Sequence, residues 1–228
     1  MQTSPDVVVF AGPSLCEAAH AAIARGGFTL RPPAERGDVE AVVREGAAPG
    51  TIVLADGHFH QHMAVGHREI RGAMRSGWRV WGVSSIGAIR AYELRRAGMR
   101  GWGRVYGLFS RFRDFQDDEV ALLNDAEPPY TPASEPLVHL RVALAALMRD
   151  HLIAAARAVR IAKSLKSMWY GDRTLALFRR LASDAAHPAR RDDVERSLER
   201  FDRFRIKQRD LAALLTARSW SAASDVSS

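Results

Sequence analysis

The sequence predicts an α/β fold, with a mostly parallel sheet and flanking helices (a Rossmann/flavodoxin-like core) and a C-terminal helical region. Three observations lead to this prediction. In the first half of the chain, short runs of apolar, β-branched residues alternate with helical patterns, as in sheets buried on both faces. Residues 127–136 (EPPYTPASEP) then interrupt both patterns with prolines. Only helical patterns follow. We therefore expect an α/β core over residues 1–126 and a helical region over residues 127–228.

Short apolar runs are the predicted strands of the core. The sequence letters place them at residues 7–10 (VVVF), 51–57 (TIVLADG) and 78–83 (WRVWGV), with a weaker extended stretch at 28–34 (FTLRPPA) and a candidate later strand at 118–124 (DEVALLN). The first and second runs end in turn-forming residues, which fits strands that stop at the edge of a sheet.

Helical patterns connect these runs and fill the second half of the chain. In the core they cover residues 15–24, a short stretch that Asp38 can cap, and residues 66–77 and 87–98, which glycines end. Beyond the prolines they cover residues 137–159, 173–182 and 192–217. The last residues, 221–228 (SAASDVSS), are typical of a disordered tail.

The composition describes a basic, water-soluble chain. Lysine and arginine number 33 and acidic residues 26, a net charge of +7. Acids are interspersed among the arginines, so the charge is either a solvated surface or a docking face for an acidic protein, and nucleic acid is not an expected partner. There is no signal-like N-terminus and no apolar run long enough to span a bilayer, so we expect a cytoplasmic protein without a membrane partner.

Cys16 is the single cysteine, which excludes an intrachain disulfide and a cysteine-based zinc cluster. It lies one turn into the first predicted helix. There it serves either as a small packing residue or as a thiol whose pKa the helix N-terminus lowers.

The residues that follow three predicted strands are the candidate site. Because parallel strands end at one edge of the sheet, we expect these loops to build a single crevice. The first loop contributes Gly12, Pro13 and Ser14, the second Asp56 and Gly57, and the third Ser84, Ser85 and Gly87. From the pattern alone, Ser84 or Ser85 is better explained as a helix N-cap than as a catalytic group, and V-S-S-I-G matches the G-x-S-x-G nucleophile motif poorly.

The helix after the third strand offers binding groups. Gly87 leaves room for a substrate beside the backbone, and the first amides of this helix suit an anion or a developing oxyanion. Arg90 and Glu93 lie three residues apart on one helix face, either as a surface pair or with Arg90 facing a carboxylate or phosphate. His67 opens another helix and is a candidate general base.

Other polar clusters have ordinary explanations. His58, His60 and His62 alternate along an extended segment, which is compatible with a metal site but is better explained by exposed loop histidines. The run Asp117, Asp118 and Glu119 is typical of a solvated turn. AGPSL lacks the glycines and lysine of a phosphate-binding loop, so we expect neither ATP nor another cofactor, and no metal.

Seven motifs in a fixed order are more specific than any single one. VVVFAGPSL, RPPAERGDV, LADGHF, GHREI, GVSSIGAIRAYEL, GMRGWG and DDEVALL together resemble the TfuA-like family. The resemblance covers residues 7–140. The helices beyond carry no motif that we can match.

The resemblance implies a partner of YcaO enzymes, which use ATP to activate backbone amides of ribosomally made peptides or proteins. The TfuA-like protein is then expected to assist thioamide formation by taking sulfur from a thiocarboxylated, ThiS-like carrier, with the precursor peptide bound through YcaO. On the matching positions we assign Ser85 as nucleophile or water-positioning group, His67 as base and Asp56 as its orienting partner.

Amides near Gly12, Ser14 and Gly87 are the expected oxyanion donors, and Arg90 is the expected contact for the carrier terminus. Two alternatives stay open. One is a noncatalytic adaptor that activates YcaO or docks the carrier. The other is a nucleotide or phosphate site in the same crevice.

Overall fold

The computed structural model describes residues 7–46, 48–57 and 63–221 of the chain. These residues group into two compact units. Unit 1 comprises Met1–Phe115 together with Lys207–Ser228, and unit 2 comprises Gln116–Ile206. The chain therefore leaves unit 1, forms unit 2, and returns to unit 1 for its last helix.

The described part of unit 1 contains one parallel sheet of five strands in the order β2-β1-β3-β4-β5. The strands are β1 (Val7–Phe10), β2 (Thr29–Arg31), β3 (Thr51–Leu54), β4 (Arg79–Gly82) and β5 (Arg100–Gly101). This finding confirms the predicted α/β class, and the order is that of flavodoxin-like sheets. Between β1 and β3 the direction of winding reverses, which is where such sheets commonly bind ligands.

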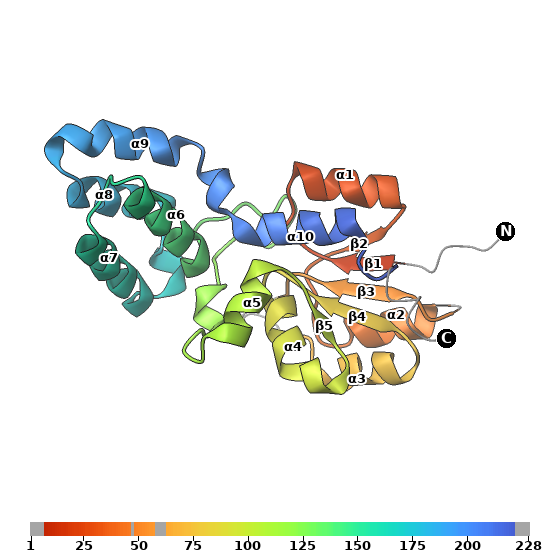
Figure 1. The fold of residues 1–228 in the computed structure, drawn as a ribbon. Helices are drawn as coiled ribbons and strands as arrows, with labels where there is room; N and C mark the ends of the chain where they lie inside the picture. The colour runs from red at the N-terminus through yellow and green to blue at the C-terminus, as the bar shows by residue number, and fades with distance from the viewer. Residues whose placement is uncertain (1–6, 47, 58–62, 222–228) are drawn as a thin grey trace. The chain divides into compact units, whose positions relative to one another are not determined.

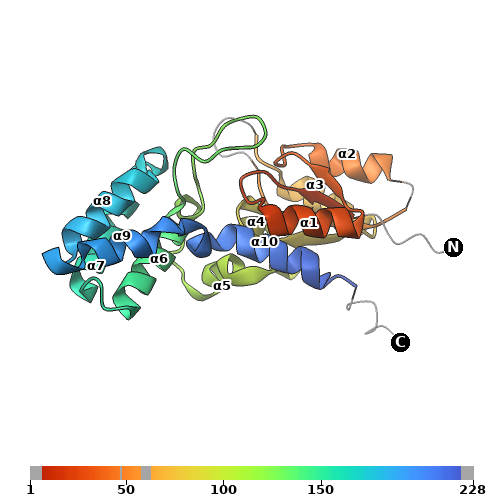
Figure 2. The same cartoon turned by 90° about the horizontal axis from the view of Figure 1, so that it is seen from above.

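Helices cover both faces of the sheet (Figure 1). On one face α1 (Glu17–Gly26) and α10 (Ile206–Ala217) pack on alternate strand residues, Val9, Val53 and Trp81 among them. Figure 2 shows α1 and α10 side by side on this face. On the other face lie α2 (Asp38–Glu45), α3 (His67–Arg75) and α4 (Ile86–Leu94).

The predicted strands at residues 7–10, 51–57 and 78–83 are confirmed, and the weaker stretch contains β2. The candidate strand at residues 118–124 is wrong. Its start is a short 3-10 helix, Asp117–Glu119, and Val120 and Ala121 are buried in irregular backbone, so their apolar pattern reflects burial alone. The fifth strand is β5, followed by α5 (Gly103–Arg111), which the sequence analysis did not identify.

Unit 2 is helical, as predicted for this part of the chain. It contains α6 (Leu137–Arg149), α7 (Ala155–Ser167), α8 (Leu175–Ala185) and α9 (Arg191–Glu199). The helices enclose an apolar core that includes Leu140, Leu147, Leu165, Phe178 and Leu198. The continuous pattern over residues 137–159 divides into two helices, because His151 takes a left-handed φ of 54° that ends the first.

The last helix, α10, belongs to unit 1 and supplies Leu211, Leu214 and Leu215 to the core on one face of the sheet. The two compact units therefore do not coincide with a division at residue 126. Whether residues 1–126 form an independent domain stays a prediction. In the described residues, none of the helices combines the length and apolarity that crossing a bilayer requires.

Candidate functional site

The carboxyl ends of β1, β3 and β4 lie next to one another, because these strands are adjacent and parallel. The loops that follow them carry eight of the residues predicted for the site. We call this set the strand-end cluster: Gly12, Pro13, Ser14, Asp56, Gly57, Ser84, Ser85 and Gly87.

Asp56 binds the loop after β1. Its Oδ2 accepts hydrogen bonds from the amides of Gly12 (2.9 Å) and Ser14 (2.8 Å), and its Oδ1 accepts one from the Ser14 hydroxyl (2.7 Å). Asp56 is buried, with 2% of the residue exposed. The two amides expected to serve a substrate oxyanion are thus occupied by an internal anion. A phosphate placed on them would face the charge of Asp56 at close range.

Ser84 forms the sharp turn between β4 and α4. Its φ is 67°, and the Ser85 amide bonds back to the Val83 carbonyl at 2.8 Å, which is the hydrogen bond of a γ-turn. The buried Ser84 hydroxyl donates to the Lys207 carbonyl at 2.7 Å. The Ser84 hydroxyl therefore links the end of β4 to the first turn of α10, and the backbone at Ser84 is strained.

Ser85 occupies the N-cap position of α4, but its side chain makes no capping hydrogen bond. The residue is 2% exposed, and its amide also donates to the Ala55 carbonyl at 3.1 Å, beside Asp56. Thus Ser85 and Asp56 are neighbours across the ends of β3 and β4. No side-chain hydrogen bond joins Ser85 to any other described residue.

Gly87 fits the helix closely onto the sheet. A Cβ at this position would lie 1.8 Å from the Leu54 carbonyl oxygen, and the Gly87 amide donates to Ala55 at 3.3 Å. The backbone that approaches Gly87 is therefore that of β3. Its amide, like those of Gly12 and Ser14, is engaged within the protein.

The first turn of α10 adds residues that the sequence analysis missed. Besides the Lys207 carbonyl, the Gln208 side chain donates to the Pro13 carbonyl at 3.0 Å, and the Cys16 thiol approaches the Gln208 carbonyl at 3.8 Å. Lys207 is 1% exposed. The Gln208 Oε1 atom is buried and has no hydrogen-bond partner in the described part of the chain. The segment IKQRD resembles any polar helix start, so no sequence signal marks its return to the strand ends.

His67, Arg90 and Glu93 form a second group, on α3 and α4. The His67 Nε2 lies 2.7 Å from the Glu93 Oε2, which also accepts from Arg90 Nη1 at 2.7 Å. Arg90 Nε donates to the Val65 carbonyl at 2.9 Å. Burial acts to raise the pKa of Glu93, but the hydrogen bonds from His67 and Arg90 and their positive charge outweigh it, so this pKa lies below its usual range.

The two groups are distinct. Ser85 and Glu93 are eight residues apart on one helix, about 12 Å along its axis. His67 is paired with Glu93, and both oxygens of Asp56 bind the loop after β1. The structure therefore brings Asp56, Ser14 and Ser85 together, but it does not join His67 to Asp56.

The acidic run of residues 117–119 is not a solvated turn. Glu119 is 1% exposed and binds Arg141 through two contacts of 2.9 Å and Lys166 at 3.0 Å. Asp118 binds the buried Arg173 at 3.1 Å. Within the described ranges, no three potential metal ligands of the His, Cys, Asp or Glu type gather. His58, His60 and His62 lie outside the described residues.

The fold and the strand-end cluster define the class: a flavodoxin-like α/β protein with polar groups at the carboxyl edge of its sheet. Comparison with protein-family models then identifies the family. The model described as TfuA-like protein matches residues 56–174, more than half of the chain, so the chain belongs to the TfuA-like family. The match starts within the strand-end cluster and continues through α7, beyond residue 140, where the motif resemblance ends. The comparison with curated proteins found no significant match.

Proposed function

We propose that the chain works with a YcaO enzyme in backbone thioamidation, and that it releases sulfur from a thiocarboxylated, ThiS-like carrier by hydrolysis. Membership of the TfuA-like family is the observation that carries this proposal, since the family resemblance implies the partner and the pathway. The position of Ser85 among buried polar groups supports the hydrolytic step.

The attacking group in this proposal is the Ser85 hydroxyl. Its oxygen adds to the thiocarboxylate carbon, the carbon–sulfur bond breaks, and the hydroxyl proton passes to the departing sulfur, giving HS⁻ and an acyl ester. Water then cleaves the ester to the carrier carboxylate and restores the serine. Because the sulfur itself accepts the proton, this route does not require His67 beside Ser85.

Asp56 has a supporting role in the proposal. By binding Gly12 and Ser14 it fixes the loop after β1 beside Ser85, in place of the orienting role toward His67. His67, Arg90 and Glu93 form a partly exposed charged group on α3 and α4. We assign this group to contact with the carrier, where Arg90 offers a charge for a carboxyl-like terminus.

The alternative is a noncatalytic adaptor, favoured by the engagement of the Gly12, Ser14 and Gly87 amides within the protein. Incubating the purified chain alone with a thiocarboxylated carrier separates the two functions. Sulfide release without YcaO is the expected result. Absence of sulfide with the chain alone, and thioamide formation only in the full mixture, supports the adaptor and contradicts the hydrolase.

A further inference from the structure

Helix α7 carries four cations. Its residues Ala155–Ser167 include Arg157, Arg160, Lys163 and Lys166 and no acidic residue. Two of these cations are engaged within unit 2. Arg157 donates to the Ala185 carbonyl at 2.8 Å, and Lys166 binds Glu119 at 3.0 Å.

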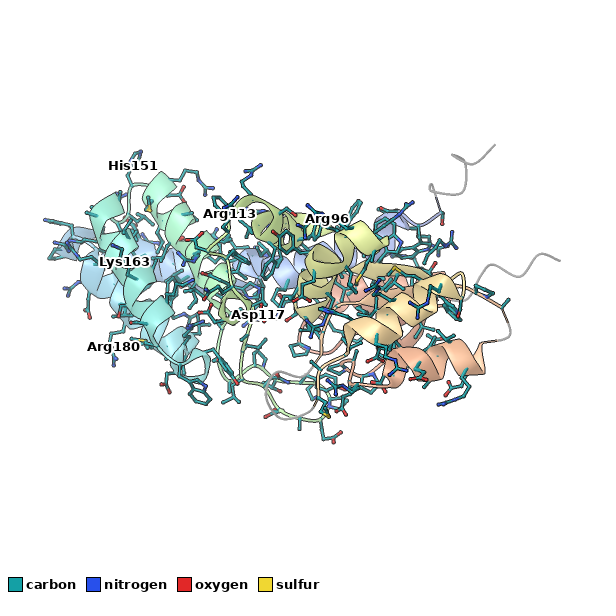
Figure 3. The ribbon with its side chains drawn as sticks, turned by 90° about the horizontal axis from the view of Figure 1, so that it is seen from below. Arg96, Arg113, Asp117, His151, Lys163 and Arg180 are labelled. Carbon is teal, nitrogen blue, oxygen red and sulfur yellow. The ribbon has the colours of Figure 1, made fainter. Side chains whose placement is uncertain are left out.

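The remaining two cations lie on the exposed face of this helix. Ala158, Ile161 and Leu165 point into the core of unit 2, so the opposite face carries residues at the helical spacing of three and four. That face comprises Ala156, Val159, Arg160, Lys163 and Ser167, all of them exposed. Figure 3 shows Lys163 on α7 and Arg180 on the neighbouring α8.

Large apolar side chains accompany these cations. Val159 is 51% exposed, and Trp169, two residues beyond the end of α7, is 56% exposed. The exposed face of α7 thus presents Val159 beside the two cations, Arg160 and Lys163. We call Val159, Arg160 and Lys163, together with the exposed Trp169 beyond the helix end, the α7 face.

The Trp169 ring packs against the residues that follow it. Its ring lies over Gly171, where a Cβ would come within 2.2 Å of the ring, and its centroid is 5.2 Å from that of Tyr170. The buried Arg173 guanidinium donates to the carbonyls of Leu165 and Met168, which fixes the backbone just before Trp169. An exposed tryptophan that is already ordered loses little entropy on binding, which is the property of interface hot spots.

We propose that the α7 face docks an acidic surface of the YcaO enzyme. This inference rests on the proposed function for the identity of the partner. The chemistry of the face specifies the rest: carboxylates on the partner to meet Arg160 and Lys163, and separate apolar contacts for Val159 on the helix and for Trp169 beyond its end. The α7 face belongs to unit 2 and contains none of the strand-end cluster.

Other occupants fit the face less well. Nucleic acid binding relies on many phosphate contacts, whereas this face offers two cations around apolar side chains. A second copy of the chain carries the same net charge of +7, which opposes self-association through a basic face.

The test is the affinity of the full-length chain for the purified YcaO enzyme, measured by calorimetry at low and at moderate salt. We expect Lys163→Glu combined with Arg160→Glu, and separately Trp169→Ala, to weaken binding at least about tenfold. Arg180→Glu is the control for charge, because it replaces one exposed cation of the neighbouring helix. We expect the Arg180→Glu variant to bind YcaO with an affinity within about twofold of that of the wild-type chain. Thermal unfolding confirms that each variant is folded.

The outcomes separate this inference from the proposed function. If the wild-type chain does not bind YcaO, the proposed partnership fails. If it binds and both α7 variants bind equally well, the docking face is wrong. If Arg180→Glu weakens binding as much as the double variant Arg160→Glu/Lys163→Glu, the docking face is also wrong, since the loss then follows from net charge. Weakening of carrier or self-association, with YcaO affinity unchanged, assigns the face to another occupant and contradicts the proposal.

Discussion

At position 84 the chain adopts a backbone conformation that glycine would take more readily. Ser84 has a φ of 67° in the turn from β4 to α4, and its hydroxyl donates to the Lys207 carbonyl. The strain of a non-glycine residue there is of order 1–3 kcal/mol, similar in size to the loss from a buried carbonyl left without its donor. The hydroxyl therefore explains why serine is tolerated at this turn.

Two substitutions at this position separate strain from hydrogen bonding. Ser84→Ala loses the hydrogen bond and keeps the strained φ, so we expect the free energy of unfolding to fall by about 1–3 kcal/mol. Ser84→Gly loses the same hydrogen bond but relieves the strain. We therefore expect the glycine variant to be more stable than the alanine variant, by up to about 1 kcal/mol in the free energy of unfolding. Urea unfolding measures both. An alanine variant as stable as the glycine variant would contradict the assigned strain.

For individual residues, the sequence predicted positions in the fold but not hydrogen-bond partners. The sequence placed Asp56, Ser85 and their loops at one edge of the sheet, since strand ends follow from buried apolar runs. It did not reveal that Asp56 would occupy the Gly12 and Ser14 amides, or that His67 would pair with Glu93. These hydrogen-bond partners depend on the direction that each side chain takes once the helices are packed. The spacing of residues along the chain does not determine that direction.

At the scale of elements, a buried charged group joins α6 to the segment that precedes α10. Glu135 is 4% exposed, and its carboxylate lies 3.0 Å from both His139 Nδ1 and Arg205 Nε. Burial acts to raise the pKa of Glu135, but the hydrogen bonds from His139 and Arg205 and their charge lower it below its usual 4.5.

This lowered pKa gives a pH-dependent stability with a definite sign. A carboxyl whose pKa is lower in the folded state contributes its full stabilisation above pH 4.5 and loses it as the pH falls through the lowered value. We expect Glu135→Gln to reduce the free energy of unfolding by about 1–3 kcal/mol at pH 7. The difference from wild type should shrink below pH 4.5. Thermal unfolding across this range checks it, and a difference that grows on acidification would refute the assigned direction.

Among the elements, long patterns were predictable and short ones were not. The apolar runs of β1, β3 and β4 and the helices of unit 2 are clear in the sequence. Strand β5 has only two residues, Arg100–Gly101, and no apolar run marks it. Residues 118–124 have such a run and form no strand, because apolar residues are also buried in irregular segments.

At the scale of the whole molecule, the core of unit 1 is completed by the end of the chain. Leu211, Leu214, Leu215 and Trp220 pack with Val9, Val53 and Trp81 on one face of the sheet. The sequence analysis grouped α10 with the other C-terminal helices, since composition reports that a segment is helical but not which core it joins.

Truncation tests this arrangement. A chain of residues 1–126 lacks α10, so part of one apolar face of the sheet becomes exposed. We therefore expect this chain to aggregate or to lose cooperative unfolding. A chain ending at residue 221 retains α10 and Trp220 and should unfold cooperatively, like the full-length protein. Cooperative unfolding of residues 1–126 alone would show that this segment is an independent domain, contrary to this expectation.

The central claim is that sulfur leaves the carrier at the carboxyl edge of the sheet, through Ser85. The most direct measurement is the rate of sulfide release from a thiocarboxylated carrier by the purified Ser85→Ala chain, without YcaO. Ser110→Ala, an exposed serine on α5, is the matched control. The account predicts that Ser85→Ala lowers the rate at least about hundredfold while folding is retained, and that Ser110→Ala does not change it. Release by Ser85→Ala at the wild-type rate would contradict it.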